Sequence, residues 1–443
     1  MHRLVLTAAL LAAAAATPAL AAPEDAISEA RLRTDIAHLV AFGTRHTLSS
    51  QTDPKRGIGA ARNWAEAELR KTSDACGKCL NIVVPETMVQ GERVPTSTRL
   101  VDVVAIQRGS QRPNEVVIVQ GHIDSRNSDP LDAVGDAPGA NDDGSGTALV
   151  LEAARVLSGH KFPTTIVYAV LSGEEQGLYG GKLLADYAAQ QGWTVKAVFN
   201  NDIVGNSRGS DGLVEDAHVR VFSEGPRADA SAALRAAQRR DGGENDSPSR
   251  NLSRWLATLA AQDAKGLAVR QVWRADRMGR GGDHLPFEDK GFPAVRFTVG
   301  VENYEAQHQN VRSEAGRPFG DTIDRMDFAY LTKVVRLNVR GLAALAAAPL
   351  PPVATAKAAV QTFTDIDWQA VPGAAAYEVW RRRTDVPGWE EKVADTAQTH
   401  VRLDGVRGDD WIFGVRARAT DGASGPIASA VPGGAFGPLP ADK

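Results

Sequence analysis

Four short and nearly continuous apolar runs mark the central part of the chain. They are VVIVQ at 116–120, TTIVYAVL at 164–171, VKAVFN at 195–200 and AVRFTV at 294–299. Runs of this length without polar alternation are typical of strands that are covered on both faces. They therefore predict the strands of a largely parallel sheet.

Segments with helical spacing of apolar residues lie between and around these runs. They are 147–157, 177–190, an Ala-rich region at about 27–71, and a long closing segment at 326–348. Alternation of strand and helix is typical of an α/β layer fold. We expect a three-layer αβα sandwich with a mixed, mostly parallel sheet. The less regular stretch 205–285 is interpreted as an insertion between strands.

The pattern changes after the Pro-rich linker PLPPV at 349–353, which cannot continue a helix. Short alternating stretches separated by Pro, Gly and Asp turns follow it, and they predict a small all-β sandwich over 351–443. DIDWQAVPGAAAYEVWRRR and WIFGVRARATDGASGP in this region resemble a fibronectin type III module. The preceding domain is expected to span 22–350.

The N-terminal residues 1–21 have the pattern of a signal peptide. Arg3 provides a positive charge, an apolar stretch follows at 4–16, and Ala19-Leu20-Ala21 is a small-residue cleavage site. We therefore expect export, to the periplasm or the extracellular medium. Cys76 and Cys79 are the only two cysteines, and in an oxidising compartment they predict a local disulfide.

Composition narrows the classes of function. The chain has 443 residues, 43% of them hydrophobic, and a net charge of 50 − 54 = −4 without a basic block. This balance is that of a globular protein and argues against nucleic acid as a partner. No stretch of about 18 apolar residues occurs after residue 22, so we expect no membrane span in the mature chain.

Acidic and histidine-bearing clusters follow the predicted strands. His122 and Asp124 lie directly after VVIVQ, and alternate residues of extended chain share a face, so Asp124 can fix the tautomer of His122. Adjacent carboxylates occur at Asp142 and Asp143 before a helix, where Asp143 or Ser145 would suffice as an N-cap. Asp142 is thus a carboxylate that needs another role.

Four further residues, from three places on the chain, complete the set. Glu174 and Glu175 stand at the exit of TTIVYAVL, where one can bind a metal while the other handles a proton. Asp202 and His308 follow later strands. In isolation each is an ordinary surface loop or cap. Ligands in open α/β sheets bind outside the carboxyl ends of the strands. Five of these residues should therefore converge there as metal ligands, namely His122, Asp142, one of Glu174 and Glu175, Asp202 and His308. Two His and three carboxylates suit a pair of Zn²⁺ ions.

The ordered motifs GHIDS, APGANDDGSG, SGEEQGLYG and NNDIVGN, followed by His308, resemble the secreted co-catalytic dizinc aminopeptidases of metallopeptidase family twenty-eight, the bacterial leucyl aminopeptidase type. The resemblance covers roughly 27–348 and implies the zinc-exopeptidase fold. It implies that Asp142 bridges two zinc ions. The remaining ligands it implies are His122 and Asp202 for one ion, and Glu175 and His308 for the other.

The same resemblance assigns other roles. It implies that Glu174 is the general base, that Asp124 supports His122, and that the peptide bond between Asp142 and Asp143 is cis. A further family-like segment, RGGDHLPFEDKGFPAV at 280–295, implies that His284 is not a zinc ligand. Family members often have Thr after the last ligand, whereas Gln309 follows His308 here.

The expected function is hydrolysis of N-terminal residues, hydrophobic ones in particular, from peptides with a free N-terminus. Acidic side chains around the metals suit a cationic N-terminus better than a carboxylate. Three alternatives stay open. A carboxypeptidase or dipeptidase would need an Arg-rich pocket, for which Arg274, Arg277 and Arg280 are possible sources. An acyl transferase like the glutaminyl cyclases would use one zinc, and a binding protein of the same fold would have lost the ligands.

Overall fold

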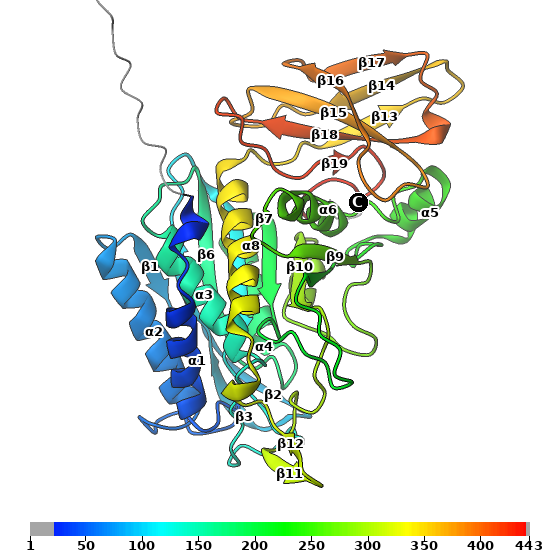
Figure 1. Ribbon diagram of the computed structural model, residues 1–443. Coiled ribbons are helices and arrows are strands. Elements are labelled where there is room, and N and C mark those ends of the chain that lie inside the picture. The colour runs from blue at the N-terminus through cyan, green and yellow to red at the C-terminus, as the bar shows by residue number, and fades with distance from the viewer. Residues whose placement is uncertain (1–21, 440–443) are drawn as a thin grey trace, which may run out of the picture.

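The computed structural model describes residues 22–439, so the expected signal peptide at 1–21 lies outside the described residues. An eight-stranded sheet forms the centre of the larger part, with the strand order β1-β4-β6-β5-β7-β10-β8-β9 (Figure 1). The strand bounds are β1 Leu80–Val83, β4 Val103–Gln107, β5 Arg112–His122, β6 Thr164–Leu171, β7 Thr194–Asn201, β8 His218–Phe222, β9 Ala268–Val272 and β10 Ala294–Val299.

The sheet is mixed, as predicted, and its central strands are parallel. β5 pairs in parallel with β6 and β7, and β10 pairs in parallel with β7. Antiparallel pairs join β1 to β4, β4 to β6 and β8 to β10. The carboxyl ends of β6, β5, β7 and β10 therefore lie at one edge of the sheet.

Helices cover both faces of this sheet. Their bounds are α1 Glu29–Ala41, α2 Ile58–Ala75, α3 Gly144–Leu157, α4 Tyr179–Gln190, α5 Ala232–Asp241, α6 Pro248–Ala261, α7 Leu285–Glu288 and α8 Phe328–Ala347. Alternate residues of β5 belong to different cores, since Val117 packs into the core with α1, α2, α3 and α8, while Val116 packs into the core with α4 and α7. The predicted three-layer sandwich is thereby confirmed.

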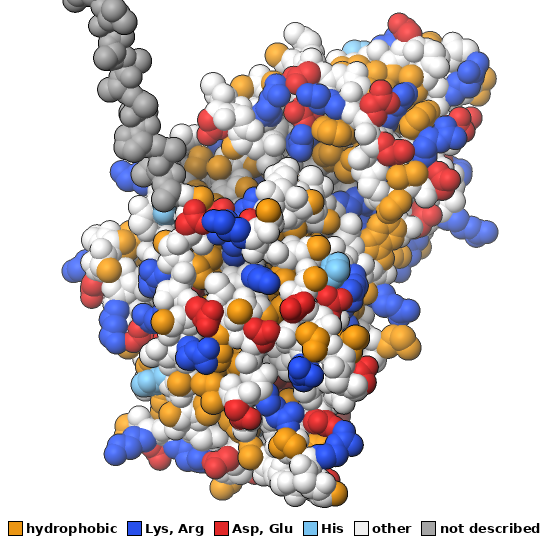
Figure 2. Space-filling model, viewed as in Figure 1, with side chains coloured by type: hydrophobic (Ala, Val, Ile, Leu, Met, Phe, Trp, Pro, Cys, Tyr) orange, Lys and Arg blue, Asp and Glu red, His pale blue; other side chains and the backbone are white. Residues whose placement is uncertain are grey.

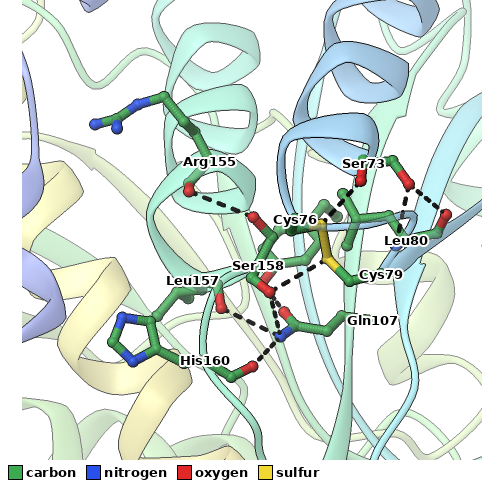
Figure 3. The surroundings of a disulfide bond; sticks show 10 residues. Ser73, Cys76, Cys79, Leu80, Gln107, Arg155, Leu157, Ser158 and His160 are labelled. Carbon is green, nitrogen blue, oxygen red and sulfur yellow. Dashed lines mark hydrogen bonds between the residues drawn. A yellow bond between two sulfur atoms is a disulfide. The ribbon is translucent and has the colours of Figure 1, made fainter.

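Cys76 and Cys79 form the predicted disulfide at the end of α2 (Figure 3). The sulfur of Cys76 lies 3.1 Å from the carbonyl oxygen of Ser73, and that of Cys79 lies 3.2 Å from the carbonyl oxygen of Ser158. Because Ser158 follows α3, the disulfide packs the end of α2 against the end of α3.

Two small antiparallel sheets follow α8. One has the order β13-β14-β17 and the other β16-β15-β18-β19. Their bounds are β13 Ala354–Lys357, β14 Phe363–Trp368, β15 Ala376–Arg383, β16 Glu391–Thr396, β17 His400–Asp404, β18 Trp411–Arg418 and β19 Ala428–Ser429. Ile366, Val379 and Val415 from both sheets share one core, so the sheets pack face to face, as the sequence predicts.

Two shorter hairpins lie at the end of the molecule far from the β-sandwich (Figure 1). They are β2 Glu86–Gly91 with β3 Val94–Val101, and β11 Arg312–Glu314 with β12 Arg317–Phe319. The start of β5 lies at the sandwich end, because Arg112 Nη2 donates to the carbonyl oxygen of Ala348 at 3.0 Å. β5 then runs for roughly 30 Å to the opposite edge, at about 3.3 Å per residue.

The β-sandwich is fixed to the larger part through polar contacts near α6. The buried carboxylate of Asp246 accepts hydrogen bonds from Arg382 Nη2 at 2.8 and 2.7 Å and from Ser429 Oγ at 2.8 Å. Because this ion pair is enclosed between the two parts, it favours one orientation of the sandwich. On the face drawn in Figure 2, positive and negative side chains are interspersed over both parts.

None of the helices that the structure describes between residues 22 and 439 is long and apolar enough to cross a bilayer.

Candidate metal centre

The predicted ligands lie at the carboxyl edge of the central parallel strands. His122 is the last residue of β5, and Asp202 directly follows the last residue of β7. Glu174 and Glu175 lie in the loop between β6 and α4. Because these strands are neighbours in the sheet, their exits bring the side chains together, as the sequence predicts.

The adjacent carboxylates Asp142 and Asp143 take different roles. Asp143 is the N-cap of α3: its Oδ1 accepts from Gly146 N at 2.9 Å, and its Oδ2 accepts from His122 N at 3.0 Å. This leaves Asp142 for the site. The peptide bond between the two residues is cis, as the resemblance implies.

Six side chains form two adjoining clusters. The first cluster contains His122, Glu174 and Asp202, and the second contains Asp142, Glu175 and His308. Within each cluster, the atoms that could bind a metal all lie within 4.8 Å of one another. Asp142 faces both clusters, because its Oδ1 lies 3.4 Å from His122 Nε2 and its Oδ2 lies 3.0 Å from His308 Nε2. All five predicted ligands are thus brought together, and Glu174 stands among them.

His122 is held from behind by Asp124. Its Nδ1 lies 3.1 Å from the backbone carbonyl oxygen of Asp124 and 3.5 Å from Oδ1 of the same residue. The carboxylate of Asp124 also accepts from the backbone N–H groups of Glu174 and Glu175, at 3.3 and 3.1 Å. Asp124 therefore supports the loop of the two glutamates as well as His122, a role that the sequence did not indicate.

His308 comes from the loop after β10. Its Nε2 lies 3.2 Å from Glu175 Oε2, and its side chain is 26% exposed, the most accessible of the ligand set. The backbone of His308 has a φ of 55°, in the left-handed region that costs energy for a residue other than glycine. The loop therefore holds His308 in a backbone conformation that is uncommon for a residue other than glycine.

The electrostatics of the site call for positive charge. Enclosure by protein raises the pKa of Glu174 well above its ordinary value, and the neighbouring charges of Asp202 and Glu175 raise it further. Burial would raise the pKa of Asp142 too, but the nearby imidazoles of His122 and His308 outweigh burial and hold this pKa well below its usual range. Carboxylates crowded in this way need a cation nearby.

Two buried atoms that could bind a metal have no hydrogen-bond partner among the described residues. They are His122 Nε2 and Glu175 Oε1. Buried polar atoms are normally satisfied, so unpaired atoms in a His and carboxylate cluster fit a metal ion. Imidazole nitrogen and carboxylate oxygen are donors that zinc accepts.

Three buried residues around the site escaped the sequence analysis. Asp321 accepts from the backbone N–H of Asp142 at 2.7 Å, and Arg45 donates to the carbonyl oxygen of Pro138 at 2.6 Å and to that of Gly139 at 2.9 Å. Arg296 Nη2 lies 2.7 Å from Asp202 Oδ1. Only Arg296 carried a signal, as a charge in the otherwise apolar run AVRFTV.

His284 belongs to neither cluster, in agreement with the sequence analysis. It is fully buried, and its Nε2 lies 2.7 Å from the carbonyl oxygen of Ala275.

A buried His and carboxylate set at the carboxyl ends of parallel strands defines a metal-dependent enzyme. Residues 102–316 match the model of peptidase family M28. The chain is 39% identical over 412 residues to a probable zinc metalloprotease of Leptosphaeria maculans, covering 92% of this chain and 95% of the relative. It is 40% identical over 415 residues to one of Pyrenophora teres, with 92% and 86% covered. The chain therefore belongs to peptidase family M28 and is a zinc metallopeptidase.

Solved structures share the fold at low sequence identity. The LapA aminopeptidase of Legionella pneumophila aligns with a TM-score of 0.51 at 19% identity, over 74% of each chain. A leucine aminopeptidase precursor of Bacteroides thetaiotaomicron aligns with a TM-score of 0.50 at 15% identity, over 71% of this chain and 96% of that one. At these identities the likeness establishes the fold.

Proposed function

We propose that the protein is an exported aminopeptidase that removes N-terminal residues, preferably hydrophobic ones, from peptides with the help of two zinc ions. The observation that carries the proposal is the position of Asp142, whose two carboxylate oxygens face the two histidines of adjoining clusters. One carboxylate shared by two clusters is the arrangement expected of a bridging ligand in a two-metal site.

The residues then divide by role. His122 and Asp202 would hold one zinc, Glu175 and His308 the other, and Asp142 both. When bound, the two ions would polarise the scissile carbonyl and lower the pKa of the attacking water. Glu174 would take a proton from that water and pass it to the leaving amine, the task of a general base and then a general acid.

Recognition of a free N-terminal amine is supported by the balance of charge at the site. The two clusters contain four carboxylates and no lysine or arginine that could pair with a substrate carboxylate. Two of the three arginines that a carboxypeptidase could use are already paired, since Arg277 and Arg280 each place Nη1 3.2 Å from Glu302 Oε2. Two structural neighbours are aminopeptidases by name, which supports the same choice.

The other parts of the proposal rest on the sequence. Export rests on the pattern of residues 1–21, and the disulfide of Cys76 with Cys79 is consistent with an oxidising compartment. The β-sandwich is proposed as a fibronectin type III-like domain. Trp368 of this domain is buried, and arginines lie over two other tryptophan rings, with Arg381 4.1 Å from the centroid of Trp411 and Arg416 5.2 Å from that of Trp380.

A pair of substrates that differ only at the amine tests the proposal. We expect the mature protein to release nitroaniline from Leu-p-nitroanilide and to leave N-acetyl-Leu-p-nitroanilide intact, because acetylation removes the positive charge that the acidic site recognises. Cleavage should stop after zinc is removed with a chelator and return when zinc is added back. Equal cleavage of both substrates would contradict the assignment, because a free amine would then not be recognised. Cleavage of N-blocked peptides that have a free C-terminal carboxylate, with both anilides left intact, would favour a carboxypeptidase.

A further inference from the structure

Arg296 is a fully buried arginine in the middle of a central strand. It lies in β10, where it is 0% exposed, and the other residues of that strand are buried too. A guanidinium in such a place is costly unless its donors are paired. Its partners therefore indicate why a cation occurs in an otherwise apolar strand.

The guanidinium joins a predicted zinc ligand to a second carboxylate. Nη2 lies 2.7 Å from Asp202 Oδ1, while Nη1 lies 3.0 Å from Asp276 Oδ2 and donates to the carbonyl oxygen of Gly281 at 2.6 Å. Charge-assisted bonds from a planar, rigid fork fix the partners in direction as well as in distance. The orientation of the Asp202 carboxylate is therefore set by Arg296.

The loop before α7 packs against the guanidinium of Arg296. A Cβ on Gly282 would lie 2.9 Å from Arg296 Nη1 and 3.2 Å from Asp276 Oδ2, so any larger residue here would press on this ion pair. Asp276 is itself held by Arg277, whose Nε donates to it at 3.1 Å. Part of the irregular stretch 205–285 thus serves to hold Arg296 in one position.

The oxygen that Arg296 engages is also the oxygen that faces the site. Asp202 Oδ1 lies 3.9 Å from His122 Nε2, its partner in the first cluster. A carboxylate oxygen has more than one lone pair, so Oδ1 can accept from Arg296 and still ligate a metal. We propose that Arg296 is a positioning residue, which orients Asp202 for the zinc ion shared with His122. This inference rests on the proposed function.

The test is the conservative variant Arg296→Lys. Lysine keeps the charge, but its single ammonium cannot span Asp202 and Asp276 as the guanidinium does. Competition with a chelator should show one of the two zinc ions bound about 10- to 100-fold more weakly, the loss typical when a partner of a metal ligand is changed. The rise in Tm that zinc produces over the chelated protein should shrink accordingly, because that rise depends on zinc affinity.

Arg250→Lys is the matched control. Arg250 is 1% exposed and donates to Ser223 and Asn245, neither of which is a candidate ligand. The Arg250→Lys variant should have a lower Tm than the unaltered protein, and the decrease should be the same with and without zinc. Asp276→Asn, which loosens Arg296 without replacing it, should weaken the same zinc ion to a smaller degree and serves if Arg296→Lys does not fold.

The outcomes separate this inference from the proposed function. If the unaltered protein binds two zinc ions and Arg296→Lys binds them with the same affinity, the positioning role is wrong and the proposed function still stands. If the unaltered protein itself holds fewer than two zinc ions, the proposed function fails and the inference fails with it. A zinc-dependent rise in Tm that falls equally in Arg250→Lys would also overturn the inference.

Discussion

Replacement of Glu174 by Gln should lower kcat for Leu-p-nitroanilide by about 10²–10⁴-fold while leaving the zinc content unchanged. Gln keeps the shape of the side chain but cannot take up a proton at neutral pH. Glu174 lies in the first cluster with His122 and Asp202, so proton transfer and metal ligation predict different results for this variant. Kinetics together with metal analysis of the same sample decide between them.

The neighbouring residue provides the contrast. Glu175→Gln should lose zinc as well as activity, because Glu175 Oε2 lies 3.2 Å from His308 Nε2 in the second cluster. If Glu174→Gln also lost zinc, Glu174 would be a ligand, and the assignment of the general base would be wrong.

Asp142→Asn should abolish the two-metal site. The amide has one oxygen, whereas the carboxylate of Asp142 directs Oδ1 toward His122 and Oδ2 toward His308. We expect loss of at least one zinc ion per chain and a fall in kcat/KM of at least about 10²-fold, since metal ions contribute several kcal/mol to the transition state. Native mass spectrometry gives the zinc count directly.

A carboxylate on the same loop is the control for this variant. Asp136 has a side chain that is 70% exposed and pairs with Arg56 at 2.7 Å. Asp136→Asn should keep both zinc ions and nearly full activity. Unchanged zinc content in Asp142→Asn would show that this residue does not bridge the metals.

The central strands could be predicted because they are buried on both faces. The runs at 164–171 and 294–299 coincide with β6 and β10, because strands that are buried on both faces are mostly apolar. β5 begins earlier than the run at 116–120, because its first residues, from Arg112, are polar and lie at the sandwich end of the sheet.

The stretch 205–285 is less irregular than the sequence suggested. It contains β8, α5, α6 and β9. α6 carries an apolar stripe of Leu252, Leu256 and Ala260, which packs into the main core, so this helix had a signal in the sequence that was missed. Polar residues on the same helix face the β-sandwich and interrupt the pattern: Asn251 Nδ2 donates to Ser429 Oγ at 2.9 Å, and Arg254 Nε donates to the carbonyl oxygen of Pro387 at 2.5 Å.

The site could be predicted as far as its residues follow strand ends. His122 and Asp202 are fixed by the exits of β5 and β7, and the motif order supplied the rest of the ligand set. Arg45 and Asp321 could not be found in this way. Their side chains bind backbone groups of other loops. Asp321, for example, accepts a hydrogen bond from the backbone N–H of Asp142, and such a long-range contact leaves no pattern in the sequence.

The number of zinc ions bound to the unaltered chain tests the central claim most directly. Native mass spectrometry of the mature protein, purified with zinc and freed of weakly bound metal, should show two zinc ions per chain. One ion would contradict the two-metal account and favour an acyl transferase, and a chain that holds none would contradict a catalytic role for the clusters formed by Asp142 and its neighbours.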